Sequence, residues 1–345
     1  MKLYVLVGII ATTAVASGFG LMVLSPPSFS VKITSSPSGS GFIAVDGNAV
    51  VTPCDFSWQS GSKHNITASI RASASGVQYA YSSWSDGGVQ SHTITINGTS
   101  DYNATFVTVM PLTYDYVPGE QMTYNMSLYE TDTAASWAGL NLNETGNMTI
   151  DVVSFDGENY TIKETRALSS SSAMGFPTTS TTSDTFQVNK TGYLLSINGG
   201  SAFVQKLSSW LGNFISAFEK NETETGNTWQ IPLSGLYPTS NSTFVFDGNL
   251  TETFGYIQNL TVPAGTYRVF SVDVSGNNLT MVANYPPLNT SISQNITTSG
   301  REYLEYGTNR MIEMSMQMSI SILQNGQTSE QGISEQIELV KYVGH

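Results

Sequence analysis

The sequence predicts a mainly β fold with one apolar helix at its N-terminus, and three observations support this prediction. Charged residues make up only 11% of the 345 residues, against about 25% in an ordinary soluble protein, while Ser and Thr together provide 85 residues. Short runs of alternating polar and apolar residues, separated by Gly, Asn and Asp, recur along the chain. An uncharged stretch, Leu3 to Leu24, follows Met1 and Lys2 directly.

The apolar stretch is long enough to cross a bilayer, because its residues span about 30 Å as a helix. Lys2 supplies the flanking positive charge, which predicts that the short end stays inside and the rest of the chain lies outside. We expect residues 1–25 to be a single-pass transmembrane signal anchor. The alternative is a removed signal peptide, since Ala14-Val15-Ala16 has the pattern of a cleavage site, and the protein would then be secreted.

N-glycosylation sequons are more frequent than chance predicts. At this Ser and Thr content about six are expected among 24 Asn, whereas fifteen are present. General richness in Asn, Ser and Thr is the alternative explanation. The single Cys54 rules out an intrachain disulfide framework and leaves its own role open, so the combination favours an archaeal cell-surface glycoprotein. The candidates are Asn65, Asn97, Asn103, Asn125, Asn143, Asn147, Asn159, Asn189, Asn221, Asn241, Asn249, Asn259, Asn278, Asn289 and Asn295.

Several functional classes are disfavoured by composition and motifs. A net charge of -13 argues against a nucleic-acid partner. No G-x-S-x-G, H-E-x-x-H, P-loop, G-x-G-x-x-G or EF-hand motif occurs. His64 and His92 have no third ligand at a convincing spacing, so we expect no metal. We therefore predict no enzyme, no catalytic residue and no cofactor.

Two pairs of carboxylates nevertheless resemble the acid and base of a glycosidase in type. They are Glu302 with Glu305, and Glu335 with Glu338. Carboxylates at the solvent-exposed ends of strands are far commoner, and we expect these pairs to be of that kind.

Residues 26–110 are expected to form a small β module. Residues 42–51 predict a hairpin, because Asp46-Gly47 supplies the positive φ angles of a type I′ turn. Aromatic residues alternate along its strands, which is more typical of core than of a carbohydrate-binding surface. Residues 30–109 resemble one copy of the divergent internalin-type B-repeat through Trp84-Ser85-Asp86-Gly87-Gly88 and Tyr102-Asn103-Ala104-Thr105-Phe106. The resemblance implies a spacer or adhesive unit.

Residues 111–345 are expected to form a larger antiparallel β domain. Residues 116–120 should make a turn that leads into its first strand, and residues 169–183 should make a long hairpin tip or a loop. Other strands are predicted at 146–155, 159–168, 185–197, 243–251, 267–274, 309–323 and 335–343.

One amphipathic helix is predicted at residues 201–220, where apolar residues recur at helical spacing after a Ser201 cap. We expect this helix to lie on the sheet, opposite a Met-rich strand. The candidate lining of an apolar cavity between them is Phe203, Leu207, Trp210, Phe214, Met314, Met316 and Met318.

The larger domain is similar to a group of uncharacterised exported domains related to the lipoprotein-carrier half-barrel, over about residues 112–343. The motifs are Val117-Pro118-Gly119-Glu120, Val262-Pro263-Ala264-Gly265 and Tyr303-Leu304-Glu305-Tyr306-Gly307. The resemblance implies an antiparallel half-barrel with a helix over its concave face, which in some members holds an acyl chain.

Taken together, the residues predict a non-enzymatic, membrane-anchored cell-surface glycoprotein with a structural or adhesive binding role. Its partners would be the membrane, through the N-terminal helix, and an envelope polysaccharide, a surface protein or a lipid. The alternative is an extracytoplasmic protein that binds a lipid or another apolar ligand in a half-barrel cavity. A third class, the subunit of a surface polymer, would require an exposed strand edge.

Overall fold

The computed structural model describes most of the chain from Pro26 onward and is mainly β, as the alternating pattern predicts. The described residues are 26–39, 41–132, 142–172, 178–192, 194–197, 200–201, 220–232, 235–238, 243–285, 290–324 and 326–344.

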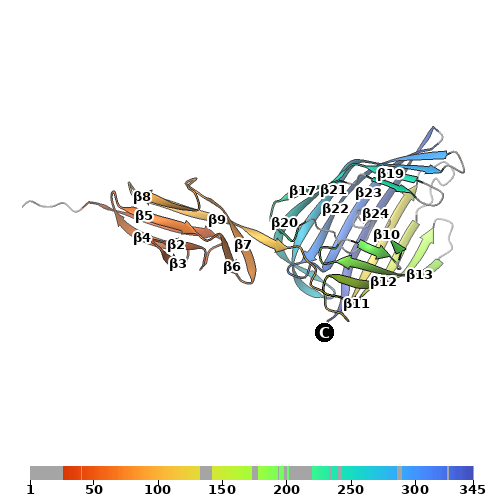
Figure 1. Ribbon diagram of the computed structural model, residues 1–345, viewed down its shortest axis with the longest axis horizontal. Coiled ribbons are helices and arrows are strands. Elements are labelled where there is room, and N and C mark those ends of the chain that lie inside the picture. The colour runs from red at the N-terminus through yellow and green to blue at the C-terminus, as the bar shows by residue number, and fades with distance from the viewer. Residues whose placement is uncertain are drawn as a thin grey trace, which may run out of the picture. The chain divides into compact units, whose positions relative to one another are not determined.

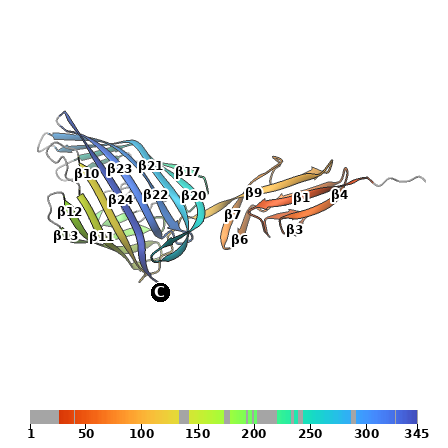
Figure 2. The same ribbon diagram turned by 180° about the vertical axis from the view of Figure 1, so that it is seen from behind.

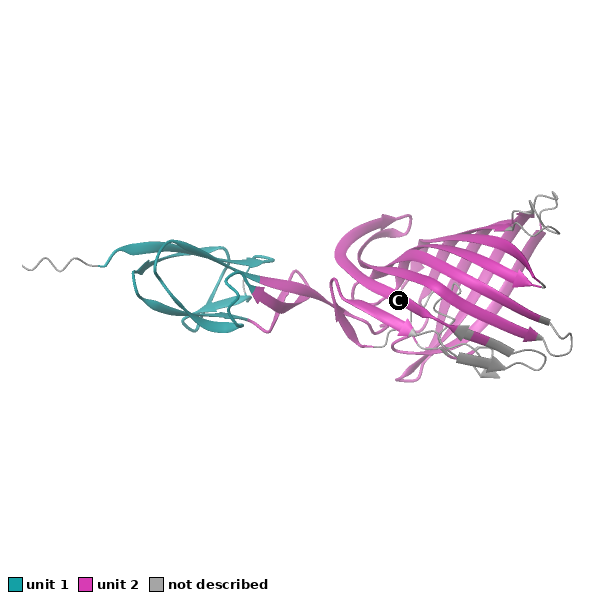
Figure 3. Cartoon of the chain, turned by 90° about the horizontal axis from the view of Figure 1, so that it is seen from above, with its two compact units in different colours: residues 1–68, 84–104 teal, residues 69–83, 105–345 magenta. Residues whose placement is uncertain are grey.

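The chain divides into two compact units (Figure 3). Unit 1 comprises residues 1–68 and 84–104, and unit 2 comprises residues 69–83 and 105–345. The boundaries predicted at 25/26 and 110/111 rest on composition alone and stay predictions.

Unit 1 is built from short antiparallel strands. Strand β1 (Ser28–Ser36) pairs with β4 (Cys54–Gln59), and a second sheet has the order β3 (Asn48–Val50), β2 (Ile43–Val45), β5 (Lys63–Ala68) and β8 (Ser91–Thr95). The hairpin predicted over residues 42–51 is confirmed, because Asp46 and Gly47 have φ angles of 51° and 80°. Free Cys54 is half-buried beside the Ile33 carbonyl.

Three strands contribute residues to unit 2 ahead of its main sheet. They are β6 (Arg71–Ala74), β7 (Val77–Trp84) and β9 (Ser100–Pro111), in a sheet whose order is β4-β1-β9-β7-β6. The far end of β9 also pairs with β16 (Glu222–Glu224).

Fourteen antiparallel strands form the main sheet of unit 2, which curls into a half-barrel (Figures 1 and 2). Its path is β15-β14-β13-β12-β11-β10-β24-β23-β22-β21-β19-β18, and β17 and β20 add to the β21 side. The strands are β10 (Gln121–Asp132), β11 (Leu142–Phe155), β12 (Asn159–Ser172), β13 (Thr178–Asn189), β14 (Leu194–Ile197), β15 (Gly200–Ser201), β17 (Thr228–Pro232), β18 (Gly235–Pro238), β19 (Thr243–Asp247), β20 (Asn249–Val262), β21 (Gly265–Tyr285), β22 (Thr290–Glu305), β23 (Met311–Gln324) and β24 (Gln327–Val343).

The predicted turns between these strands are present. Gly119 has a φ of 97°, and the Glu120 amide donates to the Val117 carbonyl at 3.0 Å, as a turn with Pro and Gly at its centre requires. Pro263 and Ala264 join β20 to β21.

Alternation along the strands divides the sheet into two faces. On β23 the side chains of Met314, Met316 and Ile320 are buried, whereas Gln317 and Ser319 are exposed. The buried side chains face the concave side, because successive residues of a strand point to opposite faces. The concave face therefore carries the core of the half-barrel.

Glycines on the concave face permit the tight curvature. Gly300 lies between Val274 and Met316 in the register of the sheet. A Cβ added there would lie 2.6 Å from the Ser315 carbonyl oxygen and against the Met316 sulfur. Gly276 is equally crowded, with the Leu250 side chain 2.7 Å from the added atom. These positions bring neighbouring strands and side chains close, as glycine kinks do in curved sheets.

Two details of the sequence prediction are corrected or left open. Residues 185–197 are two strands, because a turn with a positive φ at Gly192 separates β13 from β14. The Ser/Thr-rich segment at 169–183 belongs to the β12–β13 hairpin, although its tip lies outside the described residues.

The two predicted helices also lie outside the described part of the chain. Residues 1–25 and 202–219 are not described, and Ser201, the expected cap, pairs with Ser196 in β15. No helix within the described ranges is long and apolar enough to cross a membrane. Both helices stay predictions.

Replacing Gly300 with Ala should lower the free energy of unfolding by about 1–3 kcal/mol, because the added methyl group overpacks the concave face. Ser299→Ala is the matched control, since Ser299 is exposed on the other face and its loss should change stability by less than about 0.5 kcal/mol. Denaturant unfolding of the two variants measures the difference. Equal stabilities would show that Gly300 is not needed for the curvature.

Candidate functional site

A pocket of about 230 Å³ lies on the concave face of the half-barrel. Side chains from β10, β11, β12, β23 and β24 line it, so it sits over the middle of the sheet. Most of the lining is apolar: Met126, Leu128, Leu168, Met316, Met318, Ile320 and Ile333. An apolar pocket with few polar groups is the usual form of a small-molecule site.

Two of the predicted lining residues, Met316 and Met318, are in this pocket. Met314 is buried on the same face, two residues nearer the start of β23. Met side chains are unbranched and polarizable, so they adapt to ligands of irregular shape. The four helix residues predicted to face them, Phe203, Leu207, Trp210 and Phe214, lie outside the described residues.

Three charged side chains, Glu144, Arg166 and Glu335, are part of the lining of the apolar pocket. Every second residue of β12 faces the concave side. Glu164 and Arg166 therefore share this face with the apolar residues Ile162 and Leu168. Arg166 Nε donates to Glu164 Oε1 in an ion pair whose carboxylate is 5% exposed. Glu335 reaches the same pocket from β24.

Burial controls the protonation of the two carboxyls. Burial raises the pKa of Glu164, although the Arg166 charge opposes the shift, and Asp184 and Glu335 add to it. Burial likewise raises the pKa of Glu335, with Arg166 again opposing. Each carboxyl therefore carries a negative charge at neutral pH less readily than an exposed glutamate does.

The carboxylate pairs considered from the sequence do not converge. Glu335 is buried on the concave face, whereas Glu338, three residues further along β24, faces the other side. Glu302 and Glu305 are also an odd number of residues apart on β22, with Glu302 buried. An acid and a base of a glycosidase must flank one bond, and these pairs are divided between the faces of the sheet.

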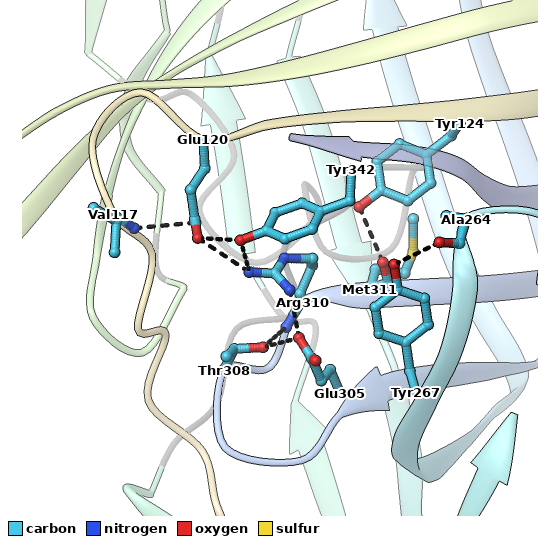
Figure 4. A network of polar contacts seen from close by, with 10 residues as sticks. All are labelled: Val117, Glu120, Tyr124, Ala264, Tyr267, Glu305, Thr308, Arg310, Met311 and Tyr342. Carbon is cyan, nitrogen blue, oxygen red and sulfur yellow. Dashed lines mark hydrogen bonds and ion pairs between the residues drawn. The ribbon is translucent and has the colours of Figure 1, made fainter. Parts of the chain in front are cut away.

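A buried polar network lies where β10 begins and β22 and β24 end (Figure 4). Arg310 is 4% exposed, and it donates to Glu305 Oε2 at 2.5 Å and to Glu120 Oε1 at 3.2 Å. Tyr342 donates to the same Glu120 oxygen at 2.6 Å, and its ring centroid lies 4.0 Å from the Arg310 guanidinium carbon. Thr308 also donates to Glu305.

Buried tyrosines surround this network and keep their protons. The Tyr124 hydroxyl donates to the Met311 carbonyl at 3.0 Å, and the Tyr160 hydroxyl donates to the Tyr114 carbonyl at 2.9 Å. Burial raises the pKa of Tyr342 to about 12 and that of Tyr124 well above its ordinary value. Most polar atoms of the cluster have internal partners, although Arg310 Nε has no hydrogen-bond partner among the described residues, so we assign the cluster a structural role.

In unit 1, Ser62, His64 and Asp46 are connected in the order of a Ser-His-Asp triad. Ser62 Oγ lies 3.0 Å from His64 Nε2, and His64 Nδ1 lies 2.8 Å from Asp46 Oδ2. The backbone amides of Gly61 and Ser62, which an oxyanion at Ser62 would need, already donate to carbonyls of unit 1. The arrangement therefore orders a turn.

The two histidines weighed as a metal pair have separate carboxylate partners. His64 bonds to Asp46, and His92 Nε2 lies 3.0 Å from Asp86 Oδ2. Within the described ranges no group of three His, Cys, Asp or Glu side chains could hold a metal ion. Trp84, from the aromatic set of this module, is 3% exposed and belongs to its core.

The sequons lie mostly at the surface. Asn125 and Asn147 are opposite each other in the register of β10 and β11, on the face away from the pocket. Among the described candidates, the exposed ones are Asn65, Asn97, Asn125, Asn143, Asn147, Asn221, Asn249, Asn259, Asn278 and Asn295, and the half-buried ones are Asn103, Asn159 and Asn189. Asn241 and Asn289 lie outside the described residues.

Sequence reasoning missed two arginines. Arg166 pairs with Glu164 on the concave face, and Arg310 is the centre of the buried network with Glu120 and Glu305. For Arg166 a signal existed, since it is an even number of residues from Ile162 and Leu168 in the same strand and therefore faces the same side. For Arg310 only Glu305 is near in sequence, 5 residues away, and its other partners Glu120 and Tyr342 are 190 and 32 residues away.

Replacing Arg310 with Gln should lower the free energy of unfolding by about 3–5 kcal/mol, because it leaves the carboxylates of Glu120 and Glu305 without their cation. The same change at Arg301 is the control. Arg301 pairs with Asp273 at the surface, where both side chains are about half exposed, so its loss should cost less than about 1 kcal/mol. Similar losses in denaturant unfolding would contradict a structural role for Arg310.

Glu335→Gln should stabilise the ligand-free protein at pH 7 and change little at pH 4. The raised pKa of Glu335 means that the folded state holds this proton more tightly than the unfolded state does. Wild-type stability therefore falls as the pH rises from the ordinary value of 4.5 through the folded pKa, and the Gln variant lacks this loss. Thermal unfolding across this range checks it, and parallel curves for the two proteins would contradict it.

Comparison with known proteins assigns no family. No family model matches the chain, and no curated protein matches it. Two crystal structures align with 68% of the chain at a TM-score of 0.25: a Bacteroides fragilis protein described as exported with a YmcC-like fold (12% identity, 100% of its length) and a protein described as a lipoprotein from Parabacteroides distasonis (11%, 99%). Such a TM-score is too low to argue from, so function is argued from the residues themselves.

Proposed function

We propose that unit 2 is a non-enzymatic binding domain that holds a slender apolar chain on the concave face of its half-barrel, outside the cell. The observation that supports this most directly is the pocket over β10, β12, β23 and β24. Its apolar lining comes from these four strands and includes Met126, Met316 and Met318. A core that only needed to fill space would be packed to a density that leaves few voids larger than a water molecule.

The size of the pocket limits the ligand. Its volume of about 230 Å³ is smaller than the roughly 300 Å³ at the lower end for pockets that take drug-sized molecules. A single alkyl chain or a small apolar group suits this volume better than a fused-ring lipid does. The row of flexible Met side chains allows the same site to take chains of different branching.

The rest of the chain supports a location outside the cell. The apolar segment at 1–25 is predicted to hold the protein at the membrane. Sequons such as Asn125, Asn147 and Asn295 lie on the face of the sheet opposite the pocket, so glycans there would shield the convex face and leave the concave face open. This division favours ligand binding over a role in which the convex face adheres to a surface.

A structural or adhesive role is the competing proposal, with a polysaccharide or a surface protein as the partner. It requires no internal pocket, and it would leave the concave Met residues as ordinary core. Subunits of a surface polymer would also need no pocket, but they would assemble as their concentration rises.

Native mass spectrometry of the full chain, purified in mild detergent from its own host, tests the proposal. We expect a mass beyond protein and glycan that is lost on denaturation. Met318 is half-buried in the pocket lining. Met318→Trp should fill the pocket and lower ligand occupancy at least tenfold. Leu323→Trp is the control, because Leu323 is 48% exposed on the other face. The proposal would be contradicted if no preparation contained a bound ligand, or if both variants had equal ligand occupancy.

A further inference from the structure

The pocket holds more negative than positive charge. Glu144 on β11 and Glu335 on β24 both stand beside Leu128 of β10 in the register of the sheet, and both line the pocket. Arg166 is the one cation among the described lining residues. Because adjacent strands are about 4.8 Å apart, the two carboxylates flank a common space roughly two strand spacings wide.

Arg166 offsets these carboxylates only in part, because its charge opposes but does not cancel the effect of burial on the pKa of Glu335. The Arg166 Nε donates to Glu164, whose side chain is nearly as buried as the core. Asp184 on β13 lies opposite Glu164 in the register and adds another negative charge to the same side. Glu144 and Glu335 therefore line the pocket with Arg166, and Glu164 and Asp184 lie next to one another on the same face.

Glu335 is the carboxylate left without a close partner. It is 9% exposed, it lines the pocket, and its carboxylate takes part in no hydrogen bond with any residue that the structure describes. Its neighbours in the register, Leu128 and Met316, are apolar. A buried carboxylate without a hydrogen-bond donor destabilises a protein unless a partner arrives.

We infer that the bound chain carries a cationic head group, such as a protonated primary amine, which forms an ion pair with Glu335 and faces Glu144. This inference rests on the proposed function and names its ligand class: a cationic single-chain amphiphile. An anionic head group would meet the carboxylates of Glu144 and Glu335 in the pocket lining, where a low dielectric constant makes repulsion strong. A neutral alcohol would gain only a hydrogen bond.

The ion pair between the ligand amine and Glu335 should depend on pH. The groups that face Glu335 are Glu144 on β11, Glu164 and Arg166 on β12, and Asp184 on β13, while β10 and β23 present Leu128 and Met316. An amine pairs with the ionised carboxylate, so binding requires Glu335 to lose its proton. Affinity for the amine should therefore fall as the pH is lowered from 8 to 5, and affinity for the alcohol should stay constant.

Calorimetric titration of the full chain with three decyl compounds, below their micelle concentrations, tests the inference. Decylamine should bind at least tenfold more tightly than decanoate, with decanol between them. Glu335→Gln, which keeps the shape of the side chain, should weaken decylamine about tenfold or more and leave decanol unchanged. Glu338→Gln, on the opposite face of β24, should change neither.

The outcomes separate this inference from the proposed function. If decanoate binds as tightly as decylamine, or if Glu335→Gln leaves decylamine unchanged, the cationic head group is wrong while the apolar site stands. If none of the three compounds binds, the proposed function itself is wrong. The wild-type series decides the charge preference even if the Gln variant does not fold.

Discussion

The half-barrel depends on one buried cation. Arg310 lies between β22 and β23, and it links Glu120 at the start of β10, Glu305 at the end of β22 and Tyr342 at the end of β24. Strands β10 and β24 are the first and last long strands of the main sheet, and they pair with each other. Two carboxylates, a hydroxyl and an aromatic ring hold the guanidinium, so the penalty for burying its charge is offset by several partners at once.

The curvature of the sheet separates two surfaces with different chemistry. The concave side carries glycines where side chains would collide and Met residues along β23. It also carries a few charged groups on β11, β12 and β24. The convex side carries hydroxyls, amides and most of the sequons on the strands. A low fraction of charged residues suits this arrangement, because the outer face stays soluble through polar side chains while the inner face offers an apolar lining with carboxylates beside it.

The sequence predicts the parts of this structure that are local. Alternation of polarity predicted most strands of the main sheet, and Asp46-Gly47 and Pro118-Gly119 predicted turns that the φ angles and hydrogen bonds confirm. The pairing of β10 with β24 was not predictable, nor was the contact of Arg310 with Glu120, because the paired residues are about 190–220 positions apart. The turn at Gly192 was missed although Asn189-Lys190-Thr191-Gly192 is a polar turn signal, because the apolar residues on both sides of it were assigned to one strand. The polar side of the pocket was missed because Glu335 was weighed with Glu338, its neighbour in sequence, which faces the other side.

The central claim is that the concave face holds an apolar chain in the native protein. A crystal structure of the full chain, purified from its own membranes without removal of lipid, tests it most directly. We expect elongated density along Met126, Met316 and Met318, with its polar end within hydrogen-bonding distance of the Glu335 carboxylate. A pocket that contains only ordered water, or that is closed by collapse of the Met side chains onto one another, would contradict it.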